Sequence, residues 1–349
     1  MSAANIRETK IGLGIKYQSA LHTALAAADC ISLTKTNASL SNVDLRTEDD
    51  AMDIGKGDEW PTQQFLTNWE VSGTIEKYLS SEFLAWLFCF GLGKTTKTSP
   101  ETGAYLYTSV PQDPVTDGID MKAFTFVEAI RQGGSPVIDR AAVGCVVNDF
   151  QISLKSGPGR ANAMATVNFV GCGKIVSPSG ITIPAVTQEH YLNAASAAIT
   201  INGTNYVTEK SFVDLDMEYS NNVRMDSGFY PGSGTDNGGA LRGRMEFGDR
   251  TLGLRFRARF KSGSTEITKL MAQTKGVATI SLTGATIAGV VNHGMTITFP
   301  ELGFASAIVQ DAEGIVVIEV TGRPMKHSSN GILTAAATCA IDGILSAAS

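Results

Sequence analysis

Histidine is the residue type best suited to acid–base catalysis and to metal binding, and the chain has four: His22, His190, His293 and His327. They are dispersed, and none lies in an H-E-x-x-H or similar spacing, which would place two imidazoles on one helix face. The sequence also lacks the G-x-S-x-G turn that exposes a nucleophilic serine in many hydrolases. A catalytic site assembled from distant positions stays open, but no spacing supports one. We therefore expect a protein that is not an enzyme and that needs no cofactor or metal.

Paired carboxylates are concentrated between Thr47 and Gln64, a segment with few apolar residues and with Gly55, Gly57 and Pro61. A calcium loop would need acidic ligands, a glycine and a closing glutamate in a fixed order, and that order is absent. The few apolar residues of the segment give no apolar surroundings that would desolvate one carboxylate for acid catalysis. We interpret the segment as a long loop between two strands, and such loops are usually functional or disordered.

The five cysteines are odd in number and scattered, without a C-x-x-C pair. Such residues are more often small buried side chains than metal ligands or disulfide partners. The first residues are polar and charged, and no apolar segment of the kind found in secretory signals follows them. We expect a soluble protein made in a reducing cytoplasm.

The formal net charge is −6 and only 18% of residues are charged, which limits the kind of partner. Binding of nucleic-acid phosphates needs clustered lysine and arginine. One set of basic residues is clustered: Arg242, Arg244, Arg250, Arg255, Arg257 and Arg259. Several of them alternate with apolar residues and would share one face of a strand. We interpret them as a solvated or ion-paired sheet face, with nucleic-acid contact as the less favoured alternative.

The chain is organised around the stretch Trp69–Gly93, which begins like a strand and changes to a helical pattern at Ser80. Ser80 or Ser81 can accept a hydrogen bond from the first helical turn, and Gly91 or Gly93 can end the helix. The helix is apolar nearly all round, and it is shorter than the ~20 apolar residues that span a bilayer. We predict a buried core helix under a β-sheet, the alternatives being a subunit interface or a membrane-associated segment.

Alternation of apolar and polar residues, interrupted by glycine and proline, predicts strands along most of the remaining chain. The expected strands include 121–130, 142–155, 163–170, 212–219, 241–247, 252–260, 294–299, 304–310 and 314–321. A hairpin about Gly248-Asp249 would join 241–247 to 252–260. The segment 94–103 is expected to be a turn-rich connection, and 264–273 a short helix.

An internal repeat is indicated by a shift of 170 residues, which places Val43-Asp44-Leu45 on Val213-Asp214-Leu215 and Gly73 on Gly243. The order of parts also recurs: strand, long loop, strand, short helix, further strands. We interpret this as duplication of one module, the alternative being two unrelated β domains. The expected organisation is an arm at 1–36, a first β domain at 37–184, a second at 185–325 and a tail at 326–349.

Three stretches resemble the tail tube, or major tail, proteins of long-tailed bacteriophages. These are Ile11-Gly12-Leu13-Gly14-Ile15-Lys16, the strand Val71–Ile75 with the apolar helix ending at Gly91-Leu92-Gly93, and Leu241–Phe256 with its Phe247-Gly248-Asp249-Arg250 turn. The resemblance implies a mainly β fold with two tandem tail-tube-like β-sandwich or barrel domains, each with one short flanking helix. It implies a structural virion protein that polymerises into stacked rings, which form the tail tube and conduct DNA.

The resemblance also implies partners. The chain would bind copies of itself, in a hexameric ring or in a trimeric ring with pseudo-sixfold symmetry, and the tape measure and tail terminator proteins. DNA would be a partner only in transit, no membrane would be involved, and the protein would be assembled into virions in the host cytoplasm. Another virion role, such as capsid decoration or tail terminator, and a carbohydrate-binding β protein are the alternatives. Ring order and the strands that line the lumen stay open.

By the same resemblance, the acidic segment corresponds to the loop that stacks successive rings. Its candidate contact residues are Glu48, Asp49, Asp50, Asp53, Lys56, Asp58, Glu59 and Trp60. A second copy of the loop is expected at 221–239, although it is glycine-rich rather than acidic. Its candidates are Asn222, Arg224, Asp226, Phe229 and Tyr230. A net acidic chain also suits a conduit that must not hold DNA phosphates, an expectation that arginines along the lumen would contradict.

Overall fold

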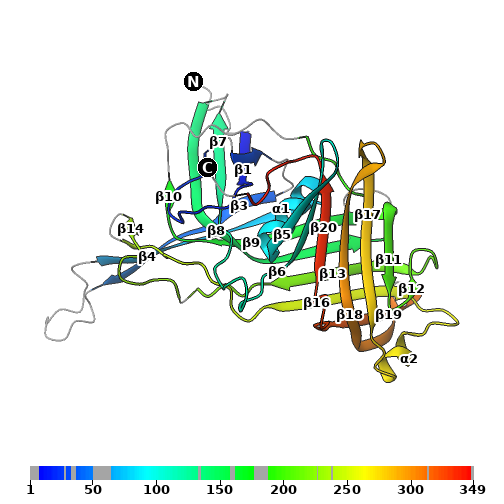
Figure 1. Ribbon diagram of the computed structural model, residues 1–349. Helices are drawn as coiled ribbons and strands as arrows, with labels where there is room; N and C mark the ends of the chain where they lie inside the picture. The colour runs from blue at the N-terminus through cyan, green and yellow to red at the C-terminus, as the bar shows by residue number, and fades with distance from the viewer. Residues whose placement is uncertain are drawn as a thin grey trace, which may run out of the picture.

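The computed structural model describes residues 8–26, 29–32, 37–49, 64–132, 135–157, 162–176, 188–225, 227–236, 239–312 and 314–346. These residues form a mainly β fold, as the sequence predicts, with one long antiparallel sheet at its centre (Figure 1). Within the described residues, α-helices occur at Ser81–Leu92 (α1) and Glu266–Met271 (α2).

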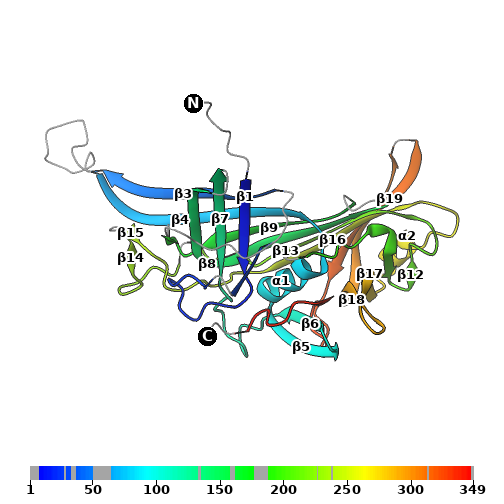
Figure 2. The ribbon, with the colours of Figure 1, turned by 90° about the horizontal axis from the view of Figure 1, so that it is seen from above.

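The main sheet has the strand order β3–β4–β9–β8–β13–β16–β19–β18, with every neighbouring pair antiparallel. The bounds are Asn37–Asp49 (β3), Gln64–Tyr78 (β4), Ala163–Gly171 (β9), Ser135–Lys155 (β8), Phe212–Ser220 (β13), Thr251–Arg259 (β16), Ile315–Pro324 (β19) and Val291–Ala312 (β18). Seen from above, β3–β4 and the β18–β19 hairpin lie at opposite ends of the molecule (Figure 2).

Two further groups of strands adjoin the main sheet. The first has the order β2–β1–β7–β8–β10, with Cys30–Ser32 (β2), Glu8–Gly14 (β1), Phe124–Gln132 (β7) and Ile175–Val176 (β10). The second has the order β12–β11–β17–β18–β20–β6–β5. Its bounds are Thr204–Asn205 (β12), Ala197–Ile201 (β11), Gly276–Ala288 (β17), Thr334–Cys339 (β20), Ala104–Pro111 (β6) and Gly93–Glu101 (β5).

The long strands β8 and β18 each belong to two groups. The first part of β8 pairs with β7 and β10, and its second part pairs with β9 and β13. The first part of β18 pairs with β17 and β20, and its second part pairs with β19. Each strand has one residue with no residue opposite it in the strand that follows. This residue is Asn148 in β8, against β9, and Ala305 in β18, against β19. A bulge of this kind bends a strand, which lets the chain pass from one sheet into another.

One pairing pattern therefore occurs twice along the chain. In the first half β3 pairs with β4, β4 with β9, β9 with β8, β8 with β7 and β7 with β1. In the second half β13, β16, β19, β18, β17 and β11 pair in the same succession. The helices α1 and α2 follow the equivalent strands β4 and β16.

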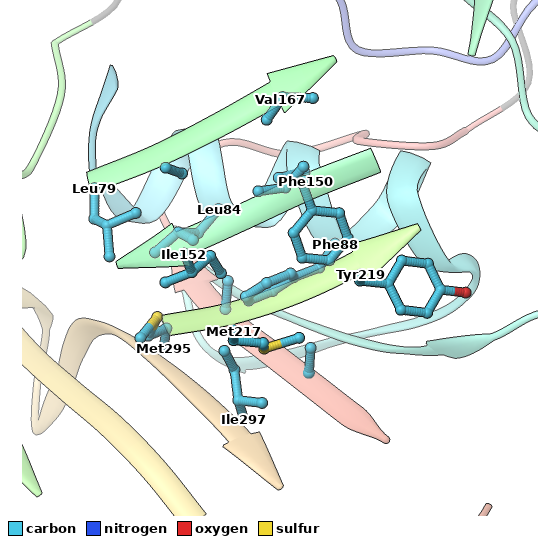
Figure 3. Packing of buried hydrophobic residues seen from close by; sticks show 14 of the residues in the cluster. Leu79, Leu84, Phe88, Phe150, Ile152, Val167, Met217, Tyr219, Met295 and Ile297 are labelled. Carbon is cyan, nitrogen blue, oxygen red and sulfur yellow. The ribbon is translucent and has the colours of Figure 1, made fainter. Parts of the chain in front are cut away.

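Helix α1 is the centre of the core, and all twelve of its residues are buried, as the sequence predicts. Ser80 caps the helix by accepting a hydrogen bond from the Phe83 amide, and Gly93 ends it at φ 86°, a conformation that favours glycine. One side of α1 packs on the main sheet, where Leu84 and Phe88 lie among side chains of β8 and β13 (Figure 3). The other side contacts β6 and β20.

Four expectations need correction. Residues 241–247 form no regular strand, so the expected hairpin about Gly248-Asp249 is wrong. The alignment of the repeat is also wrong, because the second-half equivalent of β4 is β16, whereas the 170-residue shift placed β4 on 241–247. The segment 94–103 lies largely in β5 instead of a turn-rich connection. Strands 294–299 and 304–310 are one continuous strand, β18. The segments expected as arm and tail contribute β1 and β20 to the sheets.

Candidate assembly surfaces

The main sheet has an apolar face against α1 and a polar face on the opposite side. In β8, Phe150, Ile152 and Leu154 point to the core and are at most 1% exposed, whereas Gln151 and Ser153 between them are half-buried. The same alternation continues through β9, β13, β16 and β19. Because side chains alternate along a strand, the polar positions of these strands form one surface.

Side chains on the polar face are linked by hydrogen bonds that cross one strand after another. Thr74 of β4 donates to Asn168 of β9 at 2.8 Å, and Asn168 donates to Asp149 of β8 at 2.6 Å. Ser153 of β8 donates to Asp216 of β13. The last of these bonds ties the first half of the chain to the second, because β8 and β13 meet in the middle of the sheet.

The polar face of the second half is held by ion pairs. Arg257 of β16 pairs with Asp214 of β13, and this hydrogen bond raises the pKa of the guanidinium. Arg255 lies 3.8 Å from Glu319 of β19, and Glu319 accepts a hydrogen bond of 2.9 Å from Gln310 of β18. The interpretation of an ion-paired sheet face is confirmed for Arg255 and Arg257.

The other arginines of the predicted set do not share that face. Arg244 pairs with Asp120 at 2.9 Å. Arg250 lies over the ring of Phe247, 4.2 Å from its centroid. Arg242 is 1% exposed, donates to the carbonyls of Gly171 and Met225, and lies 3.4 Å from Glu70. They lie in the irregular segment 241–250, so the strand face that several of the arginines were expected to share does not include these three.

The seam between β8 and β13 is an interface between the two halves of the chain. Asp149–Lys155 pairs with Ser220–Asp214 in an unbroken antiparallel register. On its apolar side, Ile152 of β8 and Met217 of β13 are directly opposite each other and at most 1% exposed, beneath α1 (Figure 3). The seam thus shows how a second-half strand completes the edge of the first half.

In the described part of the chain, no further strand pairs along either outer edge of the main sheet. β3 pairs only with β4, and residues 303–312 of β18 pair only with β19. Unpaired strand edges present free amide and carbonyl groups that can pair with another chain. The main sheet therefore offers one open edge at each end.

The outer edge at β18 is the counterpart of the seam edge at β8. When Asn148 of β8 is aligned with Ala305 of β18, Ile152 of β8 becomes equivalent to Val309 of β18. The residues opposite in the following strands then make Ala163 of β9 equivalent to Val316 of β19. Ile152 and Ala163 are at most 1% exposed, whereas Val309 is 41% and Val316 is 48% exposed. The second half thus exposes apolar positions that its first-half counterparts bury at the seam.

Sequence reasoning missed this exposed apolar edge. The signal was the pair of dipeptides Ile308-Val309 and Ile315-Val316 on either side of one hairpin turn. Consecutive apolar residues on a strand place one side chain on each face, and neither face is covered at the tip.

The acidic-loop candidates lie almost entirely outside the described residues. Glu48 and Asp49 are the last residues of β3, so this strand includes residues 47–49 of the segment that was expected to be a loop. The remaining candidates, Asp50, Asp53, Lys56, Asp58, Glu59 and Trp60, are not among the described residues.

The second-loop candidates are placed apart from one another. Arg224 and Tyr230 are exposed, and Asn222 donates to the carbonyl of Asp249. The half-buried ring of Phe229 packs against the Arg242 guanidinium, 4.7 Å from it. Asp226 is not among the described residues.

One cluster brings together residues that can act as acids, bases or ligands: Glu82, His190 and His293. The hydroxyl of Ser81 lies 2.7 Å from Nδ1 of His293, and Glu82 lies 3.5 Å from the same nitrogen. A catalytic triad needs the serine and the acid on opposite ring nitrogens, so this arrangement does not activate Ser81 as a nucleophile.

Within the described residues, no helix is both long enough and apolar enough to span a membrane. No individual curated protein matches the chain. The family model for phage tail tube proteins matches residues 10–324, which include every strand of the main sheet. The chain therefore belongs to the phage tail tube protein family.

Proposed function

We propose that this structural tail protein polymerises into stacked rings, and that the rings form the tail tube through which DNA passes. The observation that carries the proposal is the pair of open edges on the main sheet, one of which exposes apolar residues whose counterparts are buried at the seam. A closed ring would pair every edge, because head-to-tail contacts between subunits leave no free strand edge once the ring closes.

The seam supplies the template for the contact between subunits. β8 uses Asp149–Lys155 to pair with β13, and the bulge alignment makes Ser306–Ala312 of β18 the equivalent segment. The equivalent of β13 is β3, since both begin the repeated pairing pattern. We therefore infer that Ser306–Ala312 of one subunit pairs antiparallel with β3 of the next.

If the ring has pseudo-sixfold symmetry, six repeats surround its axis. Because each chain contributes two repeats, such a ring is a trimer. Each subunit would contribute one internal seam and one contact between subunits, alternating around the ring. This assignment makes 37–184 and 185–325 the two tube domains of the chain. The hexameric ring of whole chains is the competing arrangement.

In such a ring, the polar face of the main sheet would line the lumen, because the apolar face is covered by α1. Arg255 and Arg257 would then face the conduit, contrary to the expectation of a lumen without arginines. Their pairing with Glu319 and Asp214 supports a wall that does not hold DNA, because a paired guanidinium is less available to phosphate. The tape measure protein would occupy this lumen, and the tail terminator would cap the tube.

Electron microscopy of the purified protein, with light-scattering mass measurement of the smallest ring, tests this function. Rings or tubes are expected, with a ring mass three times that of the chain. A mass of six chains would support the hexamer instead. Folded monomers at every concentration would contradict the proposal and favour a capsid decoration role.

A proline scan tests the edge itself. Consecutive residues of a strand point their amides to opposite sides, so Ile308→Pro and Val309→Pro remove one amide from the β19 pairing and one from the open edge. One variant should fold normally and fail to assemble, whereas the other should destabilise the hairpin. If both variants assembled like the unmodified protein, β18 would not be the contact strand.

A further inference from the structure

The Glu82–His190–His293 cluster joins three parts of the chain at the first turn of α1. Nδ1 of His190 lies 2.8 Å from one carboxylate oxygen of Glu82, and the backbone amide of His190 donates to the other at 3.0 Å. The ring of His293, from β18, stacks on that of His190 with centroids 3.7 Å apart. Glu82 and His293 are at most 2% exposed, whereas the His190 side chain is 32% exposed.

The segment 188–192 is fastened to the end of β4 and the start of α1 by this cluster and its neighbours. The Leu192 amide donates to Leu79 at 2.9 Å, and the Ser81 amide donates to His190 at 3.1 Å. Glu189 pairs with Lys77, both of them at most 2% exposed, and accepts from Ser80. These contacts hold the second half of the chain against α1, because β11 follows this segment.

We propose that Glu82, His190 and His293 form a proton-responsive clasp, which holds segment 188–192 and the start of β18 against α1 at neutral pH and loosens on acidification.

The charged and titratable groups that face the cluster come from several elements. Lys77 of β4 pairs with Glu189, and Glu82 lies beside both histidine rings. Tyr191, which donates to Glu189, and Cys339 of β20 also face the cluster. The two rings are stacked so closely that a positive charge on both at once would be unfavourable.

The surroundings of His293 disfavour its charged form. Its Nδ1 lies 2.7 Å from the Ser81 hydroxyl, a contact that a neutral ring can make by accepting at this nitrogen. Burial lowers the pKa of His293 below its usual range, Glu82 opposes this effect, and His190 adds to it. A depressed folded-state pKa means that stability is complete above the unfolded value of about 6.5 and is lost as pH falls towards the folded value.

A metal ion fits the same atoms less well. The two imidazole planes are nearly parallel, at 15°, so their lone pairs cannot converge on one ion without turning the rings. Both carboxylate oxygens of Glu82 already accept hydrogen bonds from His190.

Hydrogen exchange of the monomeric protein at pH 7.5, 6.5 and 5.5, corrected for intrinsic rates, tests the clasp. Protection at 188–193 should be lost progressively across this range, because the depressed pKa of His293 lets the unfolded chain bind the proton more readily than the folded one. His293→Gln and His190→Gln should flatten this response, and the control His327→Gln should keep it. An unmodified protein with pH-independent protection, or cluster variants that respond like His327→Gln, would overturn the proposal.

Two measurements on the unmodified protein cover the case in which the variants do not fold. Imidazole nitrogen spectra of the folded protein should show that His293 becomes charged at a lower pH than a free imidazole. A ring that becomes charged at the same pH as a free imidazole, or at a higher one, would refute the clasp. Added Zn²⁺ at pH 7.5 should leave protection at 188–193 unchanged, and a gain in protection would assign the cluster to a metal instead.

Discussion

Val309 of β18 and Ile152 of β8 occupy equivalent positions beyond the bulges of their strands, yet Val309 is 41% exposed and Ile152 is 1% exposed. The difference arises because β13 and the core beneath α1 cover Ile152, whereas no described strand covers the outer side of β18. This pair of residues relates the internal seam to the surface at which the next subunit is proposed to bind.

Val309→Lys should block assembly and leave the fold intact. A lysine here would place a charge in the apolar side of the proposed contact, where burial of an unpaired charge is strongly unfavourable. In the monomer Val309 is partly exposed, so thermal stability should change little. Light scattering and thermal melting of the same sample measure both effects.

Val290→Lys is the matched control, because Val290 is 90% exposed at the turn before β18 and far from the open edge in the pairing pattern. It should assemble like the unmodified protein. If Val290→Lys also prevented assembly, a general effect of added charge would account for both results. If Val309→Lys assembled normally, the equivalence of Val309 and Ile152 would have no bearing on the ring.

Trp86→Ala should lower the free energy of unfolding by about 3–5 kcal/mol. The Trp86 ring stacks on Phe83, contacts Phe124 edge-on, and is fully buried. Its Nε1 donates to the Gly14 carbonyl at 2.9 Å, which ties α1 to the end of β1. Trp86→Phe keeps an aromatic side chain at this position but loses the hydrogen bond to Gly14. We therefore expect it to lower the free energy of unfolding by a smaller amount, about 1–2 kcal/mol. Urea unfolding followed by circular dichroism measures the free energy of unfolding of both variants. Equal losses would contradict the expectation that the packing of the ring contributes more than its hydrogen bond.

The helix and much of the sheet were predictable because local chemistry sets them. Ser80 and Gly93 mark the ends of α1 by their side-chain type, and the apolar residues between them can only be buried. Alternation likewise revealed β8 and β9, whose apolar positions face one core. These elements are specified by their own residues.

Other elements depend on partners that the local sequence does not reveal. β5 is polar and mostly exposed, so only its pairing with β6 makes it a strand. Pro300 and Gly303 suggested an interruption in β18, but the strand passes through them as it changes partners from β17 to β19. The Glu82–His190–His293 cluster joins residues far apart in the chain, and no spacing rule connects them.

Arg242→Met should destabilise the native chain by about 3 kcal/mol or more. The guanidinium is buried, donates to Gly171 and Met225, and lies beside Glu70, so its loss removes several polar contacts at once. Arg244→Met is the control, because Arg244 is half exposed and its pair with Asp120 lies at the surface. Chemical unfolding should separate the two variants clearly. A similar cost for both would mean that the buried contacts of Arg242 add little.

The native protein should react very slowly with thiol reagents at pH 8, because burial keeps its cysteines protonated. All five are buried, and burial raises the pKa of Cys172 to about 11 and those of Cys30, Cys89 and Cys339 to about 12. The thiolate is the reactive form, so each group is almost wholly unreactive at this pH. Mass spectrometry after alkylation should show no modified cysteine in the folded chain and five in urea. A cysteine labelled rapidly in the folded chain would show that its surroundings open to solvent, and its position in the sequence would identify the part of the core that does so.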